Sequence, residues 1–161
     1  MNEIDFYAQV ATAGTILGIG VGSTPDQVES ILGADFLDDR QRGLLRRDYG
    51  LLEFAFYPGA VWECRAVSVQ VHRLQWDDGD MIPVILRDRF GEFSSQIKMS
   101  ALEGRIGKLG CHVIAMPSGA DLDFKRLIVQ ESGVEIIVSN AQLHGESGFA
   151  ISGDVWSILL S

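Results

Sequence analysis

The chain has 161 residues, of which 47% are hydrophobic and 22% are charged, and this composition is typical of one globular domain. Its 22 acidic and 13 basic side chains leave a formal net charge of −9. Such a surface repels nucleic-acid phosphates and anionic lipid headgroups, so the charge argues against nucleic-acid and membrane partners and favours a basic protein.

The N-terminal part of the chain contains the clearest local signal. Residues 1–14 are compatible either with a short helix or with a mobile arm. Further along, Thr24 stands where a helix N-cap is expected, Pro25 suits the first helical position, and Gln27 completes a capping box. The sequence therefore predicts a helix that begins at Pro25 and ends at Gly33, with this glycine in a left-handed conformation.

Three strands are predicted next, after a polar, charged loop at residues 35–42. They span residues 44–47, 51–57 and 61–74. In the second strand, hydrophobic residues alternate with other side chains as in a half-buried strand, at Leu52, Phe54 and Phe56. Short turns at 48–50 and 58–59 join the strands, so we expect an antiparallel meander that leaves one face free for a helix.

The second half of the chain again mixes helix and strand. An acidic loop at 76–80 leads into residues 81–93, whose pattern favours no single structure. A helix is predicted at 94–109, with Ser100 and Glu103 as a second capping box. The strands predicted after this helix span residues 111–116, 124–130, 134–139 and 155–160, with a loop at 140–148.

These elements predict an α+β fold, in which helices pack on one face of an antiparallel sheet within a single domain, residues 1–161. One interpretation divides the domain into sub-units 1–80 and 81–161, as two tandem αβββ repeats. Each half has a helix followed by Leu-Gly and a later hairpin turn that ends in glycine, at Gly33, Gly110, Gly50 and Gly133. The other interpretation is coincidence, because any α+β chain offers matches of this kind.

Two short motifs suggest ligand binding but lack what such sites require. Gly18, Gly20 and Gly22 precede a helix, yet antiparallel strands follow and no phosphate-binding lysine is present. The acidic turn at residues 77–80 lacks the later ligands of a calcium loop. The sequence therefore predicts no catalytic residue, no bound metal and no cofactor.

The histidines and cysteines stand at no spacing typical of a catalytic or zinc site. His72, His112 and His144 are the histidines, and a site that assembles them from distant segments stays open. Cys64 and Cys111 are expected to be reduced thiols of the core. The N-terminus lacks the basic start of a signal peptide, and no run of about 18 apolar residues suits a membrane span, so we expect a cytoplasmic protein.

The most useful surface signal is an aromatic residue next to acids. Protein interfaces favour an aromatic anchor with a complementary charged rim. Trp76 begins one acidic stretch, and a second stretch lies shortly before four arginines that can neutralise it. The candidate partner-binding residues are therefore Asp38, Asp39, Trp76, Asp77, Asp78 and Asp80. The alternative for both stretches is a solvated loop.

Residues 19–33 run Ile-Gly-Val-Gly-Ser-Thr-Pro-Asp-Gln-Val-Glu-Ser-Ile-Leu-Gly and resemble the helix signature of BamE-like and β-lactamase-inhibitor-protein-like domains. Residues 49–54 look like the first hairpin of those domains, and the pattern is similar to small acidic immunity proteins found beside bacterial toxins. The resemblance implies binding to another protein through a sheet face or loops, and it implies no catalytic residue. Because the chain lacks the signal peptide and disulfides of the secreted members, the resemblance favours the cytoplasmic immunity role.

We therefore expect a non-enzymatic protein that binds and neutralises a cognate bacterial toxin through an acidic surface. In this hypothesis Trp76 is the anchor, and the neighbouring acids meet cationic residues of the toxin. Two alternatives stay open. One is a small enzyme or ligand-binding domain whose site assembles from His72, His112 and distant acids, and the other is a structural subunit of a larger assembly.

Overall fold

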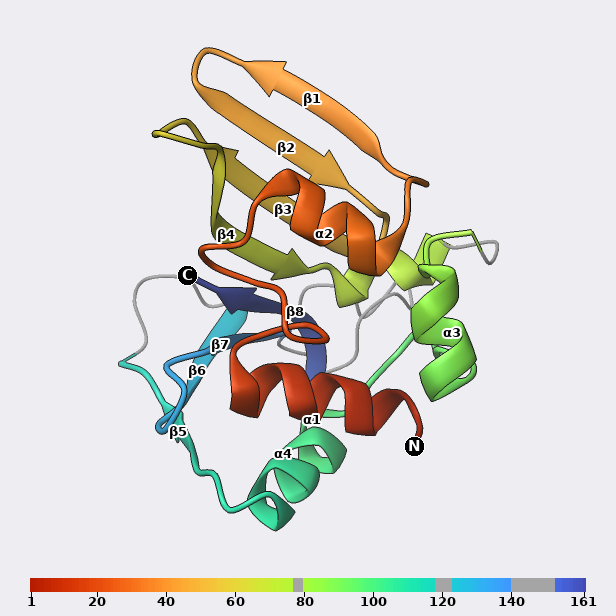
Figure 1. Ribbon diagram of the computed structural model, residues 1–161. Coiled ribbons are helices and arrows are strands. Elements are labelled where there is room, and N and C mark those ends of the chain that lie inside the picture. Colours follow the sequence, from red (N-terminus) through yellow and green to blue (C-terminus); the bar gives the residue numbers. More distant parts are fainter. Residues whose placement is uncertain (77–79, 118–122, 140–152) are drawn as a thin grey trace.

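The computed structural model describes residues 1–76, 80–117, 123–139 and 153–161 (Figure 1). The helices are α1 (Glu3–Ala13), α2 (Pro25–Leu32), α3 (Val84–Phe90) and α4 (Met99–Lys108), with a 3₁₀ helix η1 at Val71–Trp76. The strands are β1 (Leu37–Gln41), β2 (Leu44–Asp48), β3 (Leu52–Tyr57), β4 (Glu63–Val69), β5 (Val113–Ala115), β6 (Phe124–Val129), β7 (Glu135–Ser139) and β8 (Asp154–Leu160). None of the described helices is long and apolar enough to cross a membrane.

The described strands form one antiparallel sheet in the order β1-β2-β3-β4-β8-β7-β6-β5. Strands β1 to β4 make one meander and β5 to β8 another. The two meanders meet at the centre of the sheet, where residues 67–69 of β4 pair with residues 158–160 of β8. In Figure 1, α1 and α2 lie in front of the sheet and α4 packs against α1. The predicted α+β fold with an antiparallel sheet is confirmed.

Both halves of the chain contain a helix followed by a four-stranded meander: α2 precedes β1 to β4, and α4 precedes β5 to β8. The predicted repeat had three strands in each unit, so the unit seen in the structure is one strand longer. The order of elements alone does not distinguish duplication from coincidence, and the tandem repeat stays a prediction.

Side chains alternate between the two faces of each strand, and those on the face covered by the helices form the core. Leu52, Phe54 and Phe56 of β3 are fully buried on the helix side. On α1, Phe6 and Tyr7 are also fully buried, and this burial holds residues 3–13 in place as a helix rather than a mobile arm. Asn2 and Asp5 cap that helix reciprocally.

Two strand predictions need correction. Residues 35–42 are not a loop: β1 occupies 37–41 and pairs with β2 through a two-residue turn at Arg42 and Gly43. Both turn residues have positive φ, 25° and 78°, as a tight hairpin turn requires. The predicted strand at 61–74 ends at Val69, and the chain continues into η1.

The helix predictions had mixed outcomes. The capping box of Thr24 and Gln27 is present at the start of α2. Gly33 has φ 90° and ψ −177°, so its φ is positive but its backbone is not left-handed helical as predicted. The second capping box was wrong, because α4 begins at Met99 and leaves Ser100 inside the helix. The predicted loop at 140–148 lies outside the described residues.

Two glycines on the exposed side of α4 should be replaceable with a gain in stability. A Cβ added at Gly104 or Gly107 would meet no atom within 4 Å, and neither residue has a positive φ. We expect Gly104→Ala and Gly107→Ala each to raise the free energy of unfolding by about 0.5–1 kcal/mol, because glycine loses more backbone entropy in a helix. Urea denaturation measures the change, and a loss of stability in either variant would contradict the open surroundings described for α4.

Candidate functional site

The side of the sheet that faces away from the helices, termed the open face, carries an aligned row of side chains. The strand register places one residue of each strand in the row, and side chains at these positions point to the same side. From one edge to the other the row is Leu37, Asp48, Glu53, Ser68, Leu159, Glu135, Ile128 and Ile114. The charged residues lie in the middle of the sheet, and isoleucines end the row over the second meander.

Small side chains leave a hollow of about 360 Å³ in the middle of the open face. Its floor includes small residues of β3 and β4, which are Ala55, Ala66 and Ser68. Longer side chains surround the floor, at Arg46, Glu53, Tyr57, Glu135 and Leu159. The open face is therefore concave where the two meanders meet, and a side chain of another molecule can enter it.

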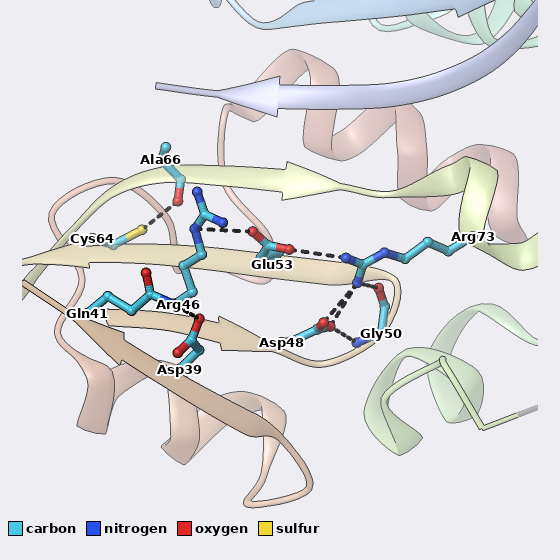
Figure 2. A network of polar contacts seen from close by, with 9 residues as sticks. All are labelled: Asp39, Gln41, Arg46, Asp48, Gly50, Glu53, Cys64, Ala66 and Arg73. Atoms are coloured by element: carbon cyan, nitrogen blue, oxygen red, sulfur yellow. Dashed lines mark hydrogen bonds and ion pairs between the residues drawn. The ribbon is translucent and has the colours of Figure 1, made fainter. Parts of the chain in front are cut away.

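A network of charged side chains borders the hollow on one side (Figure 2). Arg73 of η1 donates to both carboxylate oxygens of Asp48, at 2.9 and 3.0 Å, and to an oxygen of Glu53 at 3.2 Å. It also donates to the carbonyl oxygen of Gly50 at 3.0 Å. On the other side of Glu53, the Nε atom of Arg46 lies 4.0 Å from Oε1. Glu53 is therefore hydrogen-bonded to Arg73 and forms a longer ion pair with Arg46.

The same network joins the open face to one end of the sheet, termed the turn end. The turn end consists of the β2–β3 turn, η1 and residues 80–85. The carbonyl oxygen of Met81 accepts from the N–H of Leu51, which holds residues 80–85 against the turn. Exposed hydrophobic side chains gather around this end, with 57% of Trp76, 69% of Val84 and 78% of Leu37 accessible to solvent.

Asp38, one of the predicted partner-binding residues, is tied into the fold. It accepts two hydrogen bonds from Arg47, at 2.9 and 3.1 Å. The guanidinium of this buried arginine also lies 3.7 Å from the ring centroid of Phe36 and donates to the carbonyl oxygen of Pro25. Asp38 therefore stabilises the contact between β1, β2 and α2.

The other predicted partner-binding residues lie apart from that ion pair. Asp39 is exposed and points to the open face, opposite Arg46 in the neighbouring strand. Trp76 and Asp80 belong to the turn end and are exposed. Asp77 and Asp78 lie outside the described residues. The structure thus places Asp39 and Trp76 on two parts of the surface that the network around Arg73 connects.

The two described histidines lie at opposite ends of β6 and do not share a site. His72 stacks on Trp156, with ring centroids 4.4 Å apart, and Trp156 contacts Phe124 at the start of β6. The backbone carbonyl of His112 accepts from the N–H of Gln130, just beyond the other end of β6, and its ring contacts Glu131. About six residues of extended strand, or roughly 20 Å, separate the two ends. His144 lies outside the described residues.

His72 is held mainly by contacts that serve packing. Its Nδ1 atom lies 3.1 Å from the carbonyl oxygen of Trp156, and since a carbonyl only accepts, the neutral ring carries its hydrogen on Nδ1. Burial lowers the pKa of His72, and the neighbouring charge of Arg73 acts in the same direction. The neutral form therefore dominates near neutral pH and joins η1 to β8.

The glycine-rich loop and Cys64 contribute to the fold. The glycine-rich loop is held to β4, because the Gly22 N–H donates to the Cys64 carbonyl and the Cys64 N–H donates to the Ser23 carbonyl. Burial raises the pKa of the Cys64 thiol to about 11, so it is no activated nucleophile. Cys111 is half-buried and unpaired with Cys64. No cluster of metal-binding side chains occurs among the described residues.

Fold and site together define an α+β protein whose sheet is covered by helices on one side and hollowed on the other. Comparisons with protein-family models, with curated proteins and with solved structures found no significant match to this chain. The function of the chain is therefore inferred from the geometry and charge of its described residues. The sequence indicated Asp39 and Trp76 but missed the hollow, because Glu53 and Glu135 line the same hollow only through the order of the strands.

Proposed function

We propose that this chain is a non-enzymatic protein that binds and neutralises a basic partner, most simply a bacterial toxin domain. The observation that carries the proposal is the exposed Trp76 at the turn end, which also carries the exposed Asp80 and which the network around Arg73 joins to the hollowed open face. An exposed tryptophan with exposed hydrophobic neighbours is the usual composition of a binding hot spot.

Charge supports a basic partner. The chain has a formal net charge of −9, and residues 24–39, which include α2 and the start of β1, contain five acids and no lysine or arginine. Those acids are Asp26, Glu29, Asp35, Asp38 and Asp39. Negative potential of this kind speeds the approach of a cationic surface and suppresses binding of anionic ones.

The test uses the protein encoded by the gene beside the one for this chain. If that neighbour is a toxin, co-expression should restore growth, and the purified pair should form a stable complex. We expect Trp76→Ala to weaken the complex by about 2 kcal/mol, roughly a 30-fold rise in Kd, because it removes an aromatic anchor. Asp39→Asn and Asp80→Asn should slow association and reduce its dependence on salt.

The matched control is Leu109→Ala. Leu109 is 49% exposed, similar to Trp76, but it follows α4 and is remote from the turn end. We expect this change to leave the Kd within about threefold, as for most surface positions outside a hot spot. Equal losses from Leu109→Ala and Trp76→Ala would place the interface elsewhere, and a neighbour that neither binds nor inhibits growth would remove the immunity role.

A further inference from the structure

The hollow of the open face has acidic side chains at its sides and small side chains on its floor. Glu53 and Glu135 stand on β3 and β7 in the same row, separated by β4 and β8. Three strand spacings place their backbones about 14 Å apart. The two residues therefore line the hollow on opposite sides, with Ser68 and the larger Leu159 between them in the row.

Each of these carboxylates already binds a guanidinium outside the hollow and keeps an oxygen for another. Oε2 of Glu53 accepts from Arg73 at 3.2 Å, and Oε2 of Glu135 accepts from Arg126 at 2.6 Å. Within the described residues, Oε1 of Glu53 has Arg46 at 4.0 Å, beyond hydrogen-bond distance, and that arginine side chain is 59% exposed. Glu53 and Glu135 thus each bind an arginine already, and each has a second carboxylate oxygen that can accept another hydrogen bond.

The apolar part of the hollow suits the stem of the same side chain. Tyr57 and Leu159 line it beside Ala55, and Tyr57 is 42% exposed. A long cationic side chain buries its methylene groups along such surface while its charged end stays near carboxylates. A guanidinium also stacks on an aromatic ring, which an ammonium does less well.

We infer that the hollow between Glu53 and Glu135 is the receptor for an arginine side chain presented by the basic partner protein. This inference rests on the proposed function and gives it a second contact, separate from Trp76. In the bound state Arg46 moves aside, because its contact with Glu53 is long and exposed. The partner arginine takes its place over Ala55 and Ala66 and donates to Oε1 of Glu53, while the charge of Glu135 lies on the far side of the hollow.

The experiment titrates the whole chain, labelled with ¹⁵N, with the capped peptide Gly-Arg-Gly and with the same peptide carrying citrulline, which is neutral but has nearly the shape of arginine. We expect saturable shifts of the backbone amides of Ala55, Ala66, Ser68 and Leu159 with the arginine peptide. Affinity should lie near the millimolar range, and the citrulline peptide should bind about tenfold more weakly.

Three variants connect the signal to the hollow. Glu135→Gln should weaken binding of the arginine peptide several-fold, because it removes one of the two negative charges that line the hollow. Ala66→Leu fills the floor and should abolish the localised shifts, with urea denaturation showing that the variant is folded. Glu103→Gln is the matched control, because it removes the same charge from an exposed position on α4.

The outcomes separate this inference from the proposed function. Shifts spread evenly over the acidic surface, or shifts that persist in Ala66→Leu, would overturn the arginine receptor. If the arginine peptide fails to bind in the hollow while the basic partner still requires Trp76, the proposed function stands without this contact. If the peptide binds in the hollow but the neighbouring gene product does not bind, the receptor stands and the toxin partner is wrong.

Discussion

Replacing Gly50 with alanine is expected to lower the free energy of unfolding by about 3 kcal/mol or more. Gly50 has φ 91°, a backbone conformation that costs other residues roughly 1–2 kcal/mol. An added Cβ would also lie 2.7 Å from both the Cα atom and the carbonyl oxygen of Met81. Because these are backbone atoms, they cannot rotate away, and the β2–β3 turn must separate from residues 80–85. The midpoint of urea denaturation measures the effect.

Gly133→Ala is the matched control for that experiment. Gly133 also has a positive φ, 76°, but a Cβ added there would meet no atom within 4 Å. We expect it to lose only the backbone part, about 1–2 kcal/mol. If the two variants are equally destabilised, the close approach of Met81 to the turn is not rigid.

The Gly50 variant has a second consequence at the proposed binding surface. The Gly50 carbonyl accepts from Arg73, and its N–H donates to Asp48. A shift of the turn therefore disturbs the network that joins the hollow to Trp76. In a variant that remains folded at low temperature, we expect weaker binding of the basic partner even though no contacting side chain has changed.

The second large effect is expected at the ion pair of Asp38 and Arg47. Asp38→Ala removes two of the three hydrogen bonds of the Arg47 guanidinium, which is nearly buried, with only 6% of its side chain exposed. Breaking a fully buried pair costs about 3–5 kcal/mol, and because the Asp38 side chain is 35% exposed we expect about 2 kcal/mol here. Chemical denaturation of the purified variant measures the loss.

A double-mutant cycle isolates the pair. Arg47→Met keeps an apolar stem against Phe36 and removes the charge, so the double variant leaves no unpaired guanidinium. We expect a coupling energy of about 1.5–3 kcal/mol between the two positions, as for charged hydrogen bonds. Asp39→Ala, next in the chain but facing the open side, should change stability by no more than about 0.5 kcal/mol. A coupling near zero would mean that Asp38 is available for partner binding after all.

Sequence patterns predicted a strand well where one of its faces is buried and the other is not, and failed for β1, where neither face is buried. Alternation identified β3, since Leu52, Phe54 and Phe56 are buried and their neighbours are not. β1 has no such pattern, because all five of its residues are exposed at the edge of the sheet. Its turn uses Arg42-Gly43 rather than the more familiar Asn-Gly or Asp-Gly, so the usual hairpin signal was absent.

The start of α4 was set by a contact that no local pattern contains. The N–H of Met99 donates to the carbonyl oxygen of Gly153, and Lys98 pairs with Asp154, so residues 97–99 lie beside β8 before the helix begins. This long-range pairing sets the first residue of the helix, so the capping box predicted at Ser100 does not form. The sequence did not reveal the hollow for the same reason, because Glu53 and Glu135 are far apart in sequence and reach the same hollow only through the β4–β8 pairing.

That central pairing has a consequence for biosynthesis. β4 is made well before the strand that covers its edge, residues 158–160. During the interval the first meander presents an unpaired edge, and its partner surface on β7 is equally open. Unpaired edges are templates for wrong association. We therefore expect the nascent chain to depend on chaperones that shield strands until β8 is released from the ribosome.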